Sequence, residues 1–323
     1  MALNENKNNA LDADVSVIIV NHNTRVLLQS ALQSVLEDKS ATKEIIVVDN
    51  ASVDGSVEMV QQAFPEVKLI VNKTNERFAK PNNDAIKISN GKYVFLLNSD
   101  ASLYHGSLEK LVRYLDINPG VGACAPQLVY PDGSIQHSCR GYFTLWTHFC
   151  DMFLLDCLFP QSRLFSKSEM SYFNHKSIRE VDHVMAAAIL IRRQVINEIG
   201  MFDDNLTLVY NDLDWSMRVT QAGWKIVYFP EAQVCHHHSK TINMMNRQLE
   251  LFPEIYSNLN YFLTKHYGIY WLMMYKMLAV IGFFFRIIFW FSKSLIDSSE
   301  NTRYQMLYSW AFWKKGLVFW KMR

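Results

Sequence analysis

The sequence lacks the signatures of several large classes of protein. It has no G-x-G-x-x-G segment after its first apolar run and no G-x-x-x-x-G-K-[ST] segment, which argues against a dinucleotide oxidoreductase and a P-loop NTPase. It has no C-x-x-C pair, and its five cysteines, an odd number, indicate free thiols in a reducing compartment. Its formal net charge is +1, so charge gives no argument for a nucleic-acid partner, and we expect none.

The two ends of the chain differ from its middle. Residues 265–323 hold nine Lys and Arg but two Asp and Glu, a net charge of +7, whereas residues 1–264 carry −6. The basic end is also the aromatic end. Residues 1–14 are polar and rich in Asn, with no apolar run, so we expect a loose, flexible leader there rather than a signal peptide.

Apolar runs of strand length alternate with segments of helix length in the first half of the chain. Unbroken runs of Val, Ile, Leu and Phe are typical of strands buried on both faces of a parallel sheet. The alternation predicts βαβ units and an α/β fold with a mostly parallel central sheet flanked by helices. We expect Thr24 to cap the first helix. The expected strands are residues 15–20, 44–48, 67–71 and 93–97, and the expected helices end near residues 37, 63 and 89.

Polar clusters follow three of these strands directly, at residues 21–23, 49–54 and 98–100. Taken singly, each is typical of a turn, and residues 98–100 would then turn the chain and cap the next helix. Ligands of open α/β sheets bind beyond the carboxyl ends of the strands, so three clusters at neighbouring strands predict one ligand site. A carboxylate there, such as Asp100, can hold a hard cation that in turn holds a diphosphate.

The second half of the chain adds another polar cluster. Residues 181–193 are apolar and small, which predicts a strand or another buried element, and a helix-like segment follows to residue 199. A helix is predicted from Asn211 or Asp212 to Gly223, whose type suits a helix C-terminus. Asp212 is then either a simple cap or a general base at the rim of a crevice. Asp214 is expected as a first-turn carboxylate that the helix dipole favours.

Three adjacent histidines, residues 236–238, follow a further expected strand at residues 224–229. A solvated loop is the interpretation that the sequence favours. The alternative is that one of them is a metal ligand, because imidazole binds Mn²⁺ acceptably.

Taken in order, these segments resemble the large inverting glycosyltransferase family 2, with its GT-A fold, and within it the rhamnosyltransferase-like branch. The resemblance covers residues 14–265, and the order and spacing of the segments make it specific. The segments that carry it are VSVIIVNHN (15–23), EIIVVDNASVDGS (44–56), NERFAKPNN (75–83), YVFLLNSDA (93–101), VDHVMAAAILIRR (181–193) and YNDLDWSMRVTQAGWKIVYFPEAQVCHH (210–237).

The resemblance implies a nucleotide-sugar site in the first half of the chain. Asp49 matches the acid that holds the nucleotide base, and His22 matches a residue that lines that base. Arg77 stands where Gly is commoner, and some relatives carry Arg there against the nucleotide. Asn83 matches the Asn that ends the FAxxxN segment.

The resemblance also implies a metal site and a catalytic base. Asp100 matches the last acid of the metal-binding D-x-D, so it is expected to contact both the metal and the nucleotide sugar. Asn98 replaces the first acid. His236 matches a histidine that completes the metal shell, and Asp212 matches the catalytic base of an E-D pair whose first member is here Asn211. The implied cofactor is a divalent cation, Mg²⁺ or Mn²⁺.

The implied activity is transfer of a sugar, with inversion, from a nucleotide diphosphate donor such as a dTDP- or UDP-sugar. The best single interpretation is L-rhamnose from dTDP-rhamnose, moved to a lipid-linked glycan of a bacterial surface polysaccharide such as O-antigen or capsule. Because Asn98 and Asn211 replace acids, the alternative is a catalytically weakened nucleotide-sugar or glycan-binding protein. A nucleotidyltransferase is disfavoured, since no glycine-rich, basic loop follows the first strand.

We expect residues 15–265 to form the catalytic domain, with a nucleotide-binding half at residues 15–101 and an acceptor half at residues 102–265. Within it, residues 142–180 are aromatic and irregular. They are either a core insert or, as we prefer, a border of the acceptor site or a lipid contact. Residues 266–323 are expected to form an aromatic, basic and helical tail.

Residues 270–291 of this tail are nearly long enough to span a bilayer, which takes about 20 residues. On a helix, Arg286 and Lys293 lie on one face and Lys276 about 80° away, a single polar stripe that suits a helix lying on a membrane. A span would also export the basic end, against the positive-inside tendency. We therefore favour peripheral binding to the cytoplasmic leaflet of the inner (plasma) membrane. A third interpretation packs the tail onto the catalytic domain or onto a second subunit, which would make a homo-oligomer.

Overall fold

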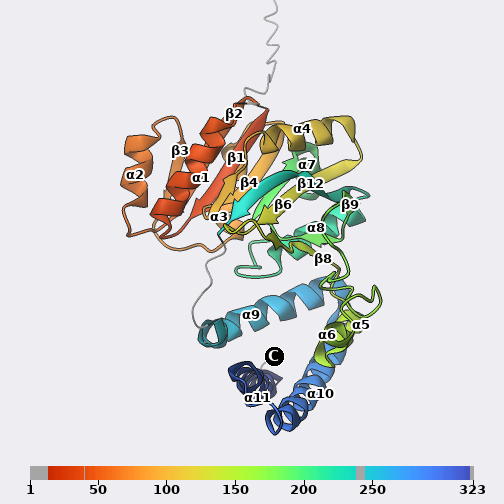
Figure 1. Ribbon diagram of the computed structural model, residues 1–323. Helices are drawn as coiled ribbons and strands as arrows, with labels where there is room; N and C mark the ends of the chain where they lie inside the picture. The colour runs from red at the N-terminus through yellow and green to blue at the C-terminus, as the bar shows by residue number, and fades with distance from the viewer. Residues whose placement is uncertain (1–13, 40, 238–243, 321–323) are drawn as a thin grey trace, which may run out of the picture. The chain divides into compact units, whose positions relative to one another are not determined.

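The computed structural model describes residues 14–39, 41–237 and 244–320, and these form two compact units (Figure 1). The sheet unit takes in the described parts of residues 1–138, 175–204 and 215–238. The helical unit takes in those of residues 139–174, 205–214 and 239–323. The predicted leader lies outside the described residues except for Asp14. The predicted division into a catalytic domain at residues 15–265 and a tail at residues 266–323 stays a prediction.

One mixed β-sheet forms the centre of the sheet unit. Its strands run in the order β3-β2-β1-β4-β11-β6-β12-β5, and two short strands join it, β7 on β6 and β9 on β12. The strands are β1 (Val15–Asn21), β2 (Lys43–Asn50), β3 (Lys68–Asn72), β4 (Tyr93–Asn98), β5 (Ala101–Leu103), β6 (Val121–Val129), β7 (Ile135–Gln136), β9 (Arg179–Glu180), β11 (Ala188–Arg192) and β12 (Lys225–His236). A further short strand, β10, spans His183–Val184.

Helices follow the strands of the parallel half and cover the sheet. α3 packs on β1 and β2, α4 packs on β6 and β12, and α1 contacts α2 and β5. The helices are α1 (Arg25–Glu37), α2 (Ser56–Ala63), α3 (Ala79–Ile88), α4 (Ser107–Ile117) and α7 (Arg193–Ile199), and α8 (Asn211–Gln221) begins in the helical unit and continues in the sheet unit. The four predicted strands and the helices between them are therefore confirmed.

The parallel half of the sheet brings the predicted polar clusters to one edge. β1 pairs in parallel with β2 and with β4, so that Asn21 is level with Asp49 and Val20 with Asn98. The side chains of β1 and β4 are almost all buried, because helices cover these central strands and their apolar runs face the core on both sides. The alternative that residues 98–100 lead into a helix is wrong, since β5 follows directly at Ala101.

The other half of the sheet departs from the parallel pattern. β11 runs antiparallel to both β4 and β6, and β5 runs antiparallel to β12. β12 also continues beyond the predicted end at residue 229, with a break in its register between Phe229 and Gln233. This continuation carries the chain to His236, which pairs with Ala101.

The helical unit contains α5 (Leu145–Met152), α6 (Leu155–Leu158), α9 (Met244–Tyr267), α10 (Ile269–Ser294), α11 (Glu300–Trp320) and the short strand β8 (Cys139–Arg140). α10 packs against α5, α9 and α11. Gly282 lets α5 approach closely, because a Cβ atom there would lie 2.4 Å from the Cβ of Met152. Most of the aromatic segment at residues 142–180 thus belongs to the helical unit, and its predicted role at an acceptor site stays a prediction.

Among the described helices, α10 is the one that is long and apolar enough to cross a membrane. The prediction that Lys276, Arg286 and Lys293 form one outward polar stripe on it is wrong. The Arg286 side chain is 12% exposed and forms an ion pair of 2.8 Å with Asp151 of α5. Arg286 also donates to the carbonyl oxygen of Met152 at 3.1 Å, so its charge is used inside the helical unit.

Candidate active site

Asp49, at the end of β2, is held rigidly in the sheet unit. One carboxylate oxygen accepts a hydrogen bond of 2.9 Å from the Asn21 amide, and the other accepts one of 2.8 Å from the Ser52 N–H. Asp49 is 1% exposed, so a nucleobase that reaches it must use the lone pairs that these two bonds leave. Its role as a base ligand stays a prediction.

His22 and Arg77 are both exposed and lie beside this carboxylate's strand. His22 Nδ1 is 2.8 Å from the Asn50 carbonyl oxygen, so Nδ1 donates and Nε2 is left as an acceptor. The carbonyl oxygen of Arg77 accepts a hydrogen bond of 2.8 Å from the side chain of the same Asn50. Asn50 therefore ties the two predicted nucleotide contacts to the end of β2.

The backbone around these predicted nucleotide contacts is strained. Asn23, Ala51 and Arg77 have positive φ angles of 54°, 60° and 66°. Non-glycine residues rarely adopt this conformation, and such residues cluster at functional sites where surrounding contacts enforce it. The contact between Asn50 and the Arg77 carbonyl is one of those that enforce it here.

Thr24 joins two strand ends rather than capping a helix. It is the residue before α1, but its side chain makes no capping hydrogen bond. Its hydroxyl instead lies 2.6 Å from Asn21 Oδ1 and 2.8 Å from Ser99 Oγ. The predicted cap is therefore wrong, and Thr24 links the end of β1 to the turn that carries Asp100.

Asn83 has a different place from the other predicted contacts. Its amide nitrogen donates to the Phe202 carbonyl at 2.9 Å and to Asp204 at 2.7 Å, and its oxygen accepts from the Phe202 N–H at 3.0 Å. The residue is 3% exposed. These bonds tie Asn83 to the loop at residues 202–204, and its role as a nucleotide-sugar contact stays a prediction.

Asp100 and His236 meet because two strands pair. β5 follows Asp100 and lies antiparallel to β12, and the His237 N–H donates to the Asp100 carbonyl at 2.9 Å. The pairing leaves His236 Nε2 3.2 Å from Asp100 Oδ1 and 3.5 Å from the Asn98 amide. The interpretation of residues 236–238 as a solvated loop is thus wrong for His236, which is 3% exposed, while His238 lies outside the described residues.

The second ring nitrogen of His236 sets its tautomer. Nδ1 lies 2.8 Å from Gln136 Oε1, so Nδ1 donates and Nε2 presents its lone pair toward Asp100. Two ligands at right angles on one octahedral ion, each about 2.1 Å from it, are about 3.0 Å apart. The separation of 3.2 Å between Nε2 and Asp100 Oδ1 therefore fits two ligands of one cation.

The donor set at this point is small. Within the described ranges, no group of three or more His, Cys, Asp and Glu side chains is arranged to hold a metal ion. Asp100 and His236 would leave further positions to water and to phosphate oxygens, as is usual for a cation that binds together with a phosphorylated substrate. The amide nitrogen of Asn98, rather than its oxygen, lies toward His236.

Asp212 lies in the helical unit, at the start of α8. It is partly exposed, and its N–H donates to Asn211 Oδ1 at 2.9 Å. Asn211 is buried, and its amide nitrogen contacts the Leu206 carbonyl at 3.4 Å. Since Asp212 and Asp100 belong to different units, their meeting at one active site stays a prediction.

Asp214 is more than a first-turn carboxylate. It is fully buried, and its Oδ1 forms ion pairs of 2.7 Å with Lys265 and with His266 of α9. The predicted place of Asp214 in the first turn of α8 is confirmed, and these two partners hold its carboxylate there in addition to the helix dipole. Two cationic or donating side chains, about fifty residues away in the sequence, hold the first turn of α8.

The same face of α9 holds the rest of the segment that leads to Asp212. Asn258 Oδ1 accepts the N–H groups of Leu208 and Val209 at 2.9 and 3.1 Å. Thr207 donates to Glu254 at 2.7 Å. Glu254, Asn258 and Lys265 are spaced as one helix face requires, so α9 fixes this segment along its length.

Most of the predicted site residues lie in the sheet unit, and Asp212 lies in the helical unit. His22, Asp49, Arg77, Asp100 and His236 belong to the sheet unit, where the strand ends position them. Sequence reasoning missed Gln136, which orients His236, and the α9 residues that hold Asp214. Neither has a local signal, because each acts across a long sequence separation.

Comparison with known proteins agrees with this architecture. The family model described as Glycosyl transferase family 2 matches residues 16–200, more than half of the chain. Uncharacterized protein y4gI of Sinorhizobium fredii is 27% identical over 234 residues, which are 70% of this chain and 24% of that protein. O-antigen biosynthesis protein RfbC of Myxococcus xanthus is 25% identical over 245 residues, 74% of this chain and 18% of that protein. The chain thus spans a minor part of both.

A third relative is covered over most of its length. The N-acetylglucosaminyl-diphospho-decaprenol L-rhamnosyltransferase of Mycobacterium tuberculosis is 26% identical over 240 residues, 68% of this chain and 75% of that enzyme. The resemblance to this family, seen in the order of the sequence segments, is confirmed.

Solved structures show the fold. The mannosyltransferase PcManGT from Pyrobaculum calidifontis, in complex with GDP-Man and Mn²⁺, has a TM-score of 0.54 at 15% identity and covers 98% of this chain and 89% of its own. GalNAc-T7 with UDP, GalNAc and Mn²⁺ has a TM-score of 0.51 at 17% identity and covers 69% of this chain and 44% of its own. The predicted GT-A fold is confirmed.

Proposed function

The chain belongs to glycosyl transferase family 2, and from this premise we propose that it is a metal-dependent, inverting transferase acting on a lipid-linked glycan. One observation carries the proposal: Asp49, Asp100 and His236 stand at the ends of strands of one sheet, where ligands of open α/β sheets bind. Glycosyl transfer is the role of the family.

The donor side would use the sheet unit. His22, Asp49 and Arg77 would receive the nucleotide, and Asn50 keeps His22 and the Arg77 backbone in place. Asp100 and His236 would hold a divalent cation that supplies positive charge to the departing diphosphate. The Gln136 hydrogen bond would place the remaining ring proton of His236 on Nδ1, so that Nε2 would act as a ligand rather than as a donor.

The acceptor side would use Asp212. A hydroxyl is a poor nucleophile until its proton is removed, and Asp212 would take that proton as the new C–O bond forms. The bond from the anomeric carbon to the diphosphate breaks on the opposite face, which inverts the configuration. Asp212 lies in the first turn of α8, where the positive end of the helix dipole points toward its carboxylate.

The finer assignments follow the relatives. We propose L-rhamnose from a dTDP donor as the sugar, because the Mycobacterium tuberculosis relative is named a rhamnosyltransferase. Its name also supports a diphospho-polyprenol-linked acceptor, and RfbC supports a surface polysaccharide such as O-antigen. The exposed apolar face of α10, with the basic residues of α11, supports peripheral binding to the cytoplasmic leaflet of the plasma membrane.

The test is a panel of donors on the full chain. dTDP-rhamnose, UDP-glucose, UDP-N-acetylglucosamine and GDP-mannose are each added with Mn²⁺, with Mg²⁺ or with EDTA, and the melting temperature is measured. We expect one donor to raise the melting temperature, and to do so only when a divalent cation is present. If none of the donors shifts the melting temperature in either metal, the proposal fails.

The second measurement separates an enzyme from a binding protein of the same fold. The donor that binds is incubated with a polyprenyl-diphosphate-linked N-acetylglucosamine, and release of nucleotide diphosphate is followed. Transfer or hydrolysis supports the transferase. Binding with neither one favours the alternative, in which Asn98 and Asn211 have weakened catalysis.

A further inference from the structure

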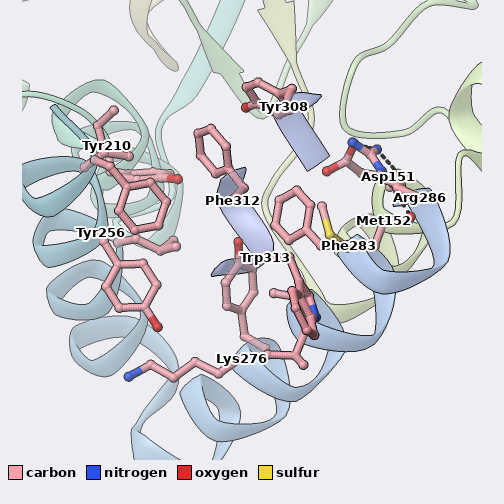
Figure 2. Close-up of a pocket in the computed structure, with 16 residues that line it drawn as sticks. Asp151, Met152, Tyr210, Tyr256, Lys276, Phe283, Arg286, Tyr308, Phe312 and Trp313 are labelled. Carbon is pink, nitrogen blue, oxygen red and sulfur yellow. Dashed lines mark hydrogen bonds and ion pairs between the residues drawn. The ribbon is translucent and has the colours of Figure 1, made fainter. Parts of the chain in front are cut away.

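The helical unit contains a cavity of about 330 Å³ that none of the proposed catalytic residues lines (Figure 2). Its walls come from α9, α10 and α11, from the end of α5, and from Tyr210 just before α8. This volume lies at the lower end of the range for small-molecule sites.

The lining is mostly apolar and aromatic. Figure 2 shows Tyr256, Phe283, Tyr308 and Phe312 around the space, from three different helices. Arg286 at its edge is neutralised by Asp151, to which it is joined at 2.8 Å. The cavity therefore suits a hydrocarbon chain rather than a sugar or a nucleotide, which would need many more polar partners.

Lys276 supplies the remaining charge of the lining. Its Nζ lies 5.3 Å from the centre of the Tyr256 ring, and among the described residues no carboxylate pairs with it. Figure 2 shows the side chain extended past the aromatic lining. A ligand that complements this cavity therefore has one anionic group attached to an apolar chain.

α10 presents apolar residues on two faces. Ala279, Val280 and Phe283 line the cavity, whereas another face of the same helix is exposed. The exposed residues include Met273, Met277, Ile281, Phe284 and Ile288, which follow helical spacing. The same helix therefore offers an apolar surface both to the cavity and to the outside of the helical unit.

We propose that this cavity binds the isoprenyl chain of a phosphorylated polyprenol, with the phosphate beside Lys276. The choice of an isoprenyl lipid rests on the proposed acceptor. The site would also place that lipid next to the segment that leads to the proposed base: Tyr210 lines the cavity, stacks on Phe262 of α9, and precedes Asp212 by two residues. Lipid and base would thus be positioned by one helix, α9.

The test measures binding of farnesyl monophosphate to the full chain, below the critical micelle concentration, by intrinsic fluorescence or calorimetry, with no nucleotide sugar present. We expect saturable binding of farnesyl monophosphate and none of inorganic phosphate. Farnesol should bind more weakly, since it lacks the charge that Lys276 complements. Lysophosphatidic acid, which carries an acyl chain and also a phosphate monoester, is the competing ligand. Equal or tighter binding of lysophosphatidic acid overturns the isoprenyl assignment.

Two cavity-filling variants locate the site. Ala279→Phe, and the milder Ala279→Leu, occupy the space and should weaken farnesyl phosphate binding about tenfold or more, a loss of about 1.4 kcal/mol. Met273→Phe, on the exposed face of the same helix, should leave it unchanged. Unchanged affinity in a folded Ala279→Leu or Ala279→Phe variant, judged by circular dichroism, overturns the site.

A charge variant tests the head-group contact. Lys276→Gln should weaken binding of farnesyl phosphate about tenfold but leave farnesol unchanged, because a charge-assisted contact is lost. Lys293→Gln, an exposed cation on the same helix, is the matched control. Equal effects of the two variants would overturn the assignment of Lys276.

Failure of this inference and failure of the proposed function are distinguishable. Donor binding with a cation is measured on the same preparations. A protein that binds the donor but no isoprenyl phosphate refutes the cavity alone, whereas one that binds isoprenyl phosphate but no donor refutes the transferase alone.

Discussion

Gln136 Oε1 lies 2.8 Å from His236 Nδ1 and turns the other ring nitrogen, Nε2, toward Asp100 at 3.2 Å. The two residues are 100 positions apart in the chain. β7, which ends at Gln136, pairs with β6, and β12 pairs with β6 from its other side. The sheet itself therefore builds the contact that makes His236 a suitable metal ligand.

Replacing Gln136 tests this relationship. Gln136→Leu removes the acceptor that fixes the tautomer of His236, so Mn²⁺ affinity should fall about 10- to 100-fold, as is usual when such a partner is lost. Mn²⁺ binding is measured by electron paramagnetic resonance. Gln136→Glu keeps an acceptor and should restore affinity, and Gln62→Leu, an exposed residue at the end of α2, should have no effect. Equal affinity in Gln136→Leu would remove the proposed role.

Replacing Asp212 tests the base. Asp212→Asn keeps the shape but cannot take a proton, so turnover should fall by about 10²–10⁴-fold while donor affinity is unchanged. Turnover is followed by nucleotide release, and donor affinity by the shift of the melting temperature. If Asp212→Asn loses donor binding in step with activity, the assignment of Asp212 as the base is wrong.

The features that could be predicted from the sequence are the local ones. β1, β2 and β4 each carry their apolar run and their polar end within about ten residues, so the parallel half of the sheet and its site edge follow from local pattern. Parallel pairing then places Asn21 level with Asp49, as the shared edge requires.

The features that could not be predicted depend on long-range pairing. Pro230 interrupts the ladder of β12 and marks a strand end by local rules, yet the strand continues past an irregular register to His236. The antiparallel placement of β5, which brings Asp100 to His236, is a property of the whole sheet. The inward turn of Arg286 depends on Asp151, which lies in α5, 135 residues earlier.

Breaking the support of Asp214 should destabilise the protein. His266→Leu removes one of the two partners of a fully buried carboxylate, so we expect a loss of about 2–3 kcal/mol in the free energy of unfolding. Because α8 carries Asp212 in its first turn, turnover should fall as well. The measurement is denaturant unfolding together with turnover at saturating donor.

The control for that variant is an exposed pair. Lys293 and Asp297 are 3.8 Å apart and more than a third exposed, so solvent screens the pair and Lys293→Met should change stability far less than His266→Leu does. If His266→Leu and Lys293→Met prove equally mild, α9 does not hold the segment that bears the base.

Acid should destabilise the helical unit through His148. This residue of α5 is buried against Tyr275, with ring centres 3.8 Å apart, and its Nε2 has no hydrogen-bond partner among the described residues. Burial lowers the pKa of His148 from 6.5 to about 3, so the folded protein keeps the ring neutral. The unfolded chain takes up a proton below pH 6.5 and the folded chain does not, so stability is lost as the pH falls.

The size of this effect follows from the two pKa values of His148. Between pH 7.5 and pH 5 the proton uptake of the unfolded chain should lower the free energy of unfolding by about 2 kcal/mol. Other groups titrate in this range, so the quantity to measure is the difference between wild type and His148→Phe in denaturant unfolding at each pH. The variant cannot titrate at this position and should lose about 2 kcal/mol less. Parallel pH profiles of the two proteins would contradict the prediction. They would show that the folded protein protonates His148 as readily as the unfolded chain does.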